Sequence, residues 1–148
     1  MSICTFFGHR LCPATLEAEL RSVLRDLIEC HGVDTFYIGN QGAFDGMALA
    51  VLRELAHLYP QITYTVVLAY LPSPQINGQS SRLDFSNNTI YPEGIETVPQ
   101  RFAINWRNRW LLKQADYVVT YVTHSWGGAA KFAGKAKQMG KVVIELAE

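Results

Sequence analysis

The sequence predicts a three-layer α/β/α domain built around a mainly parallel, five-stranded sheet. Short apolar runs alternate with helical periods, the runs are apolar almost throughout, and glycines follow several of them. Strands that are separated by helices need crossover connections, so they pair in parallel and are covered on both faces. Because 148 residues are the usual length of one domain, we expect a single domain over residues 1–148.

The first half of the chain is predicted to form three strands and two helices. Residues 2–7 are an apolar run that Gly8 ends, and leucines then recur every three or four residues over 13–31, which is typical of an amphipathic helix. The next predicted elements are a strand at 34–39, a helix at 45–58 and a strand at 62–70.

The second half begins with a segment of different composition. Residues 71–99 hold four of the six prolines and a polar run, so we expect an irregular loop or lid there. The elements that follow are a helix at 99–114, a strand at 117–122, a helix at 128–139 and a strand at 141–146. This order is that of a Rossmann-like domain, in which ligands bind beyond the carboxyl ends of the strands.

Composition narrows the class of protein. The formal net charge is zero and 49% of the residues are hydrophobic, which is ordinary for a globular chain and disfavours a general nucleic-acid or membrane binder. The three cysteines lack zinc spacing and indicate free thiols. With no signal-peptide pattern and no long apolar stretch, we expect a cytoplasmic protein. We also expect neither a metal ion nor a resident cofactor.

Four turns after strands fall at one edge of the predicted sheet. They are "GHR" at 8–10, "GNQGAFDG" at 39–46, the segment 71–99 and "THSWGGA" at 123–129. Arg10 offers a guanidinium suited to phosphate, or else belongs to a plain tight turn. Asp45 either caps a helix or binds a ribose hydroxyl. The fingerprint of a dinucleotide site is absent.

The last of these turns has the features of an anion site. Free N–H groups at a helix start bind phosphate, and Ser125, Gly127, Gly128 and Ala129 are the candidate donors, with Lys131 adding positive charge. P-loop spacing is absent, so a structural turn is the alternative. His9 and His124 also lie at this edge, and Cys12 near His9 is a weak indication of thiol chemistry.

The helix at 99–114 concentrates positive charge. Arg101, Arg107 and Arg109 are either solvated or directed at the edge of the sheet where these turns lie, together with the amide of Asn105 or Asn108. Trp106 and Trp110 lie four residues apart on one helix face, which is either a core face or a surface for forming a homodimer.

Taken together, "FFGHR", "GNQGAFD", "RNR", "ADYVVTYV", "SWGGAAKFAGKA" and "KVVIEL" resemble the SLOG superfamily. That superfamily joins the DNA-processing (Smf) proteins with the Lonely Guy phosphoribohydrolases, and this chain is most similar to its small stand-alone members of the T-G-H-R type from Firmicutes and their phages. The resemblance implies a Rossmann-like fold that binds a nucleotide-derived ligand. By position, the implied ligand-binding residues are Gly8, His9, Arg10, Gly39, Gly42, Asp45, Arg107, Asn108, Arg109, Ser125, Gly127, Gly128 and Ala129. Lys131 is a further candidate because of its positive charge.

The chain departs from the Lonely Guy motif where that motif carries catalysis. Lys131 stands for its Thr and Gly134 for its Glu, so the carboxylate that would stabilise a ribosyl cation is missing there. We therefore expect binding, as a sensor or sequestering protein, of a phosphorylated nucleotide or an NAD-derived molecule such as an ADP-ribose derivative. The alternatives are a nucleoside-monophosphate phosphoribohydrolase and a regulator that binds single-stranded nucleic acid or a protein partner.

Overall fold

The computed structural model describes residues 1–40, 42–69 and 89–146. Over these ranges the helices are α1 (Leu16–His31), α2 (Ala43–Leu58), α3 (Gln100–Gln114) and α4 (Gly128–Gln138), with a short 3₁₀ helix, η3 (Ile95–Thr97). The strands are β1 (Ile3–Gly8), β2 (Thr35–Ile38), β3 (Thr63–Val67), β4 (Thr89–Ile90), β5 (Tyr117–Tyr121) and β6 (Val142–Glu145). Of the predicted loop or lid at 71–99, residues 71–88 lie outside the described ranges.

The strands form one parallel sheet in the order β4-β3-β2-β1-β5-β6. The predicted α/β fold is confirmed, but the sheet has six strands rather than five. The additional strand, β4, is a two-residue edge strand whose partner is β3, with Val66 opposite Thr89. So short a strand carries no period-2 pattern that sequence reasoning could detect.

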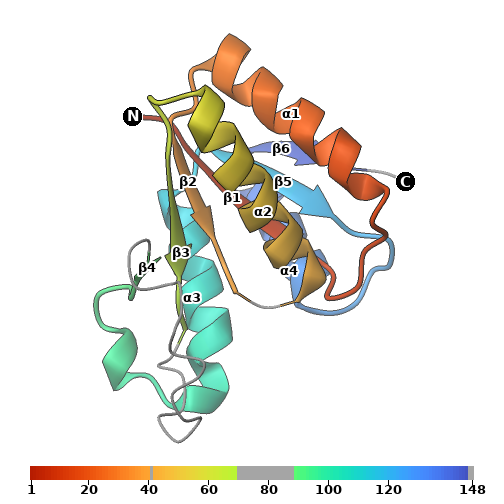
Figure 1. Cartoon of the computed structure of the whole chain (residues 1–148). Coiled ribbons are helices and arrows are strands. Elements are labelled where there is room, and N and C mark those ends of the chain that lie inside the picture. Colours follow the sequence, from red (N-terminus) through yellow and green to blue (C-terminus); the bar gives the residue numbers. More distant parts are fainter. Residues whose placement is uncertain (41, 70–88, 147–148) are drawn as a thin grey trace, which may run out of the picture.

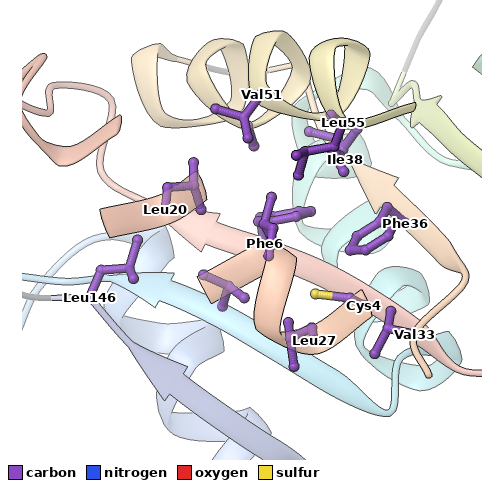
Figure 2. Close-up of a cluster of buried hydrophobic side chains, with 14 of the residues drawn as sticks. Cys4, Phe6, Leu20, Leu27, Val33, Phe36, Ile38, Val51, Leu55 and Leu146 are labelled. Carbon is purple, nitrogen blue, oxygen red and sulfur yellow. The ribbon is translucent and has the colours of Figure 1, made fainter. Parts of the chain in front are cut away.

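Two helices cover each face of the sheet (Figure 1). Successive residues of a strand point to opposite faces. Phe6 accordingly belongs to the cluster under α1 and α2, whereas Phe7 belongs to the cluster under α3 and α4. Figure 2 shows the first cluster, in which Phe6, Phe36 and Leu20 pack between the sheet and the two helices. Double burial explains why the strands are apolar almost throughout.

Helix boundaries follow local chemistry. The predicted helix at 13–31 begins only at Leu16, because Pro13 opens a turn in which its carbonyl accepts the Leu16 N–H at 3.0 Å. Gly32 ends the helix in the left-handed conformation, with φ 69°, as the sequence predicts. No helix in the described ranges combines the length and the apolarity that a membrane crossing requires.

Candidate functional site

A pocket of about 670 Å³ opens where the strand order reverses. Chain order runs from β1 through β2 and β3 on one side and passes to β5 on the other, so the loops after β1 and β5 diverge. The volume lies within the range of small-ligand pockets, which is about 300–1,000 Å³. Ten of the predicted residues line it: Gly8, His9, Arg10, Gly39, Asp45, Arg107, Asn108, Gly127, Gly128 and Ala129.

The loop after β1 is hydrogen-bonded to the segment at the end of β5 and to the start of α2. The His9 N–H donates to the Tyr121 carbonyl at 3.3 Å, and the Thr123 N–H donates to His9 Nε2 at 2.8 Å. On the other side, the Ala43 N–H at the start of α2 donates to the Arg10 carbonyl at 2.7 Å. The loop is therefore fixed between the end of β5 and the first turn of α2, and it presents the exposed Arg10 side chain at the pocket.

Three aromatic rings are stacked at the pocket wall. The His9 and His124 ring centroids are 3.7 Å apart with planes 15° apart, and His124 and Trp126 are 3.7 Å apart with planes 16° apart. His124 Nδ1 lies 2.9 Å from the Trp126 carbonyl, which only accepts, so this nitrogen carries the proton. Trp126 ends the stack and is 70% exposed. Its indole offers a flat apolar surface beside the pocket.

The start of α4 supplies backbone donors next to this stack. No side chain caps the helix. Its first N–H groups, at Gly128, Ala129 and Ala130, have no intrahelical acceptor either, as at the start of every α-helix. Gly127 precedes them with φ 96° and ψ 171°, a conformation that is almost restricted to glycine. The Gly-Gly turn thus directs an uncapped, electropositive helix end at the pocket.

Arg107 is a buried scaffold residue at the pocket floor. It is 2% exposed, and its Nη1 donates to the Val67 carbonyl at 2.7 Å, while Nε donates to Asn108 Oδ1 at 3.0 Å. Asp45 Oδ2 and Arg107 Nη2 both lie about 3 Å from the place where a Gly39 Cβ would be. A carboxylate and a guanidinium thus converge on the open side of Gly39. Arg107 Nη1 also donates to Asn40 Oδ1 at 3.4 Å, which links α3 to the loop after β2.

Gly8 lines the pocket for a structural reason. A Cβ built there would lie 2.2 Å from the Phe44 ring, so α2 approaches the end of β1 because the side chain is missing. Gly42, predicted as a ligand residue, is outside the pocket lining, and a Cβ there would meet the Arg10 Cα at 2.7 Å. Both glycines allow close packing of backbone and side chains around the loop after β1.

Three further predicted residues lie outside the lining: Arg109, Ser125 and Lys131. Arg109 is exposed on the outer side of α3, and Lys131 lies one turn into α4. Sequence reasoning placed His124 at the edge without a role, and it missed Trp126 as a site residue. A large aromatic residue inside a glycine turn after a strand was the available signal.

The surroundings of Cys12 disfavour thiol chemistry. Burial raises the pKa of the Cys12 thiol, which disfavours the reactive thiolate. Among the described residues, no group of three or more His, Cys, Asp or Glu side chains is arranged to hold a metal ion.

Comparison with known proteins identifies the fold. No family model and no curated protein matches the sequence. The solved structure of DNA processing protein A from Helicobacter pylori, described for its unique single-stranded DNA binding mode, superposes with a TM-score of 0.69 at 15% identity. DNA processing protein A from Streptococcus pneumoniae superposes with a TM-score of 0.71, also at 15% identity.

These alignments cover 99% and 98% of this chain, but only 66% and 50% of the respective neighbours. At this identity the likeness concerns the fold alone. The Rossmann-like fold implied by the SLOG resemblance is therefore confirmed.

Proposed function

We propose that the pocket binds a nucleotide unit of a single-stranded nucleic acid. The observation that carries the proposal is the exposed Trp126 indole, stacked on His124 and His9 directly beside the uncapped start of α4. Single-stranded nucleic acids are bound by this combination of an aromatic surface for a base and donors for a phosphate.

Each part of a nucleotide has a partner in this arrangement. The phosphate accepts from the Gly128 and Ala129 N–H groups, where the helix dipole favours negative charge. The base stacks on the outer face of Trp126, which needs no particular base because every base has a π-face. Arg10, exposed in the loop after β1, adds a guanidinium within the same pocket.

Two further lines support this choice. The Helicobacter pylori protein, which shares the fold, binds single-stranded DNA. The resemblance to the DNA-processing branch of the SLOG superfamily also favours binding of single-stranded nucleic acid. We infer that the chain belongs to the small T-G-H-R type, since "FFGHR" forms the end of β1 and its loop.

A free nucleotide derivative is the second candidate. A pocket of about 670 Å³ is large enough for a small ligand. The formal net charge of the chain is zero, so its overall charge does not favour a polyanion over a free nucleotide. Phosphoribohydrolase activity is less well supported. Gly134, at the position of the missing catalytic Glu, is exposed on α4, and the pocket's Asp45 converges with Arg107.

The test is a titration of the protein with a fluorescent thymidine 12-mer, and with AMP and ADP-ribose as competitors. We expect the 12-mer to bind more tightly than either competitor, and Trp126→Ala to weaken it by about 1–3 kcal/mol, the usual contribution of one stacked base. Leu58→Ala is the control, since Leu58 is 61% exposed on α2.

Two results would contradict the proposal. Unchanged affinity of the Trp126→Ala protein would remove the indole from the site. Binding of AMP or ADP-ribose without binding of the 12-mer would establish the small-molecule candidate instead.

A further inference from the structure

The outer side of α3 carries positive charge that the pocket does not use. Arg101, Arg109 and Lys113 are exposed there and, with Asn105, recur every four residues, which places the four side chains along one side of the helix. We call these four residues the basic stripe. The 15 residues of α3 include no Asp or Glu, although the whole chain is neutral.

The charges of the stripe are available to a partner. Within the described ranges, the ion pairs lie within α1, between α1 and α2, and between α4 and β6. None of these pairs includes Arg101, Arg109 or Lys113. The Arg101 guanidinium lies 4.7 Å from the Phe102 ring centroid, and Phe102 is itself 49% exposed. An unpaired guanidinium beside an exposed ring suits a phosphate with a neighbouring base.

The basic stripe is continuous with the pocket. Ile104 and Asn108 line the pocket from α3, and they lie one turn from Arg101 and Asn105, respectively. Because α3 leads into the parallel strand β5, its first turn lies at the carboxyl edge of the sheet and its last turn at the opposite edge (Figure 1). The stripe therefore runs for about 18 Å along the outside of α3, from the carboxyl edge of the sheet toward the opposite edge.

From these placements we propose that the basic stripe of α3 is a track for the phosphates of a single strand that leaves the pocket. The inference rests on the proposed function and extends it from one nucleotide to several. A polyanion is the occupant that charge complementarity favours, because regularly spaced cations on a helix without Asp or Glu match a regularly charged backbone. An acidic polypeptide is the competing occupant.

The experiment compares two double variants of the full chain. Arg101→Ala/Arg109→Ala removes two cations from the stripe, whereas Arg53→Ala/Lys141→Ala removes the same charge from α2 and from the turn before β6. Binding of a thymidine 12-mer and of a thymidine dinucleotide is measured by fluorescence anisotropy over a salt series. Circular dichroism checks that both variants are folded.

We expect the stripe variant to bind the 12-mer at least tenfold more weakly, with the slope of log K against log salt reduced by roughly 1.4, from about 0.7 for each lost phosphate contact. Dinucleotide binding should be unchanged, because the pocket is intact. The control variant should stay within about twofold of the wild type, since two distant charges act only through the screened general field.

Other outcomes separate the two claims. An equal loss in both double variants, or no loss in either, overturns the track and leaves the pocket proposal standing. A wild-type protein that binds neither oligonucleotide overturns both. Displacement of the 12-mer by polyglutamate as efficiently as by unlabelled 12-mer assigns the stripe to an acidic polypeptide.

Discussion

His9 connects the pocket to pH. Its Nε2 accepts the Thr123 N–H, so the neutral ring holds the loop after β5 in place. Burial, and to a lesser extent the stacked His124, lower the pKa of His9 below its ordinary value of 6.5. In the unfolded chain His9 takes up a proton near that value, whereas the folded protein resists protonation. The stability from neutral His9 is thus present above about pH 6.5 and is lost as pH falls below it.

This sign gives a prediction for His9→Gln. A glutamine oxygen still accepts a hydrogen bond but does not titrate, so the melting temperature of this variant should fall less between pH 7.5 and pH 5.5 than that of the wild type. Differential scanning calorimetry measures both. Parallel declines would show that His9 does not couple folding to pH.

Single residues also show where sequence reasoning could not succeed. Arg107 and Arg109 are two positions apart in "RNR", and both were predicted to bind ligand. The structure buries Arg107 against the Val67 carbonyl and leaves Arg109 exposed on the outer side of α3. Which arginine enters the fold depends on how α3 packs on β3, and no local pattern encodes that packing.

At the scale of elements, the junction between β5 and α4 decides whether an anion site exists. Gly127 adopts φ 96° and ψ 171°, where a Cβ is strained, although the nearest atom to such a Cβ, His124 Cε1, is 3.8 Å away. We expect Gly127→Ala to lower the free energy of unfolding by about 1–3 kcal/mol through backbone strain, and to weaken oligonucleotide binding as the first N–H groups turn away.

Gly134→Ala is the matched control in the same helix. An added Cβ there meets nothing within 4 Å, so this variant should gain about 0.5–1 kcal/mol of stability with unchanged binding. Chemical denaturation and anisotropy measure both properties. A Gly127→Ala protein as stable as the wild type, with normal binding, would mean that the turn does not fix the donors.

Elements were easier to predict than the contacts between them. The helical period of α1 follows from the burial of one face of the helix, and the apolar runs of β1 and β5 follow from burial on both faces of the sheet. These elements could therefore be predicted from the sequence. The pocket could be predicted because parallel strands end at one edge. The stack of His9, His124 and Trp126 could not, because it depends on two loops from opposite ends of the chain meeting within a few ångströms.

At the scale of the molecule, the reversal of strand order between β1 and β5 places the two halves of the site together. The loop after β1 gives His9 and Arg10, and the turn after β5 gives Trp126 and the donors of α4. The buried Arg107 fixes α3 to β3, and the basic stripe lies on its outer side. The fold thereby places a pocket and a charged helix side on one continuous surface.

The most direct test of this account is an amide chemical-shift titration of the ¹⁵N-labelled protein with a thymidine 12-mer. We predict the largest shifts at the Gly128 and Ala129 amides and at the Trp126 indole N–H, with smaller ones along the exposed side of α3. Saturating oligonucleotide that shifts none of these signals, or only signals on α1 and α2, would contradict the claim that the pocket binds single-stranded nucleic acid.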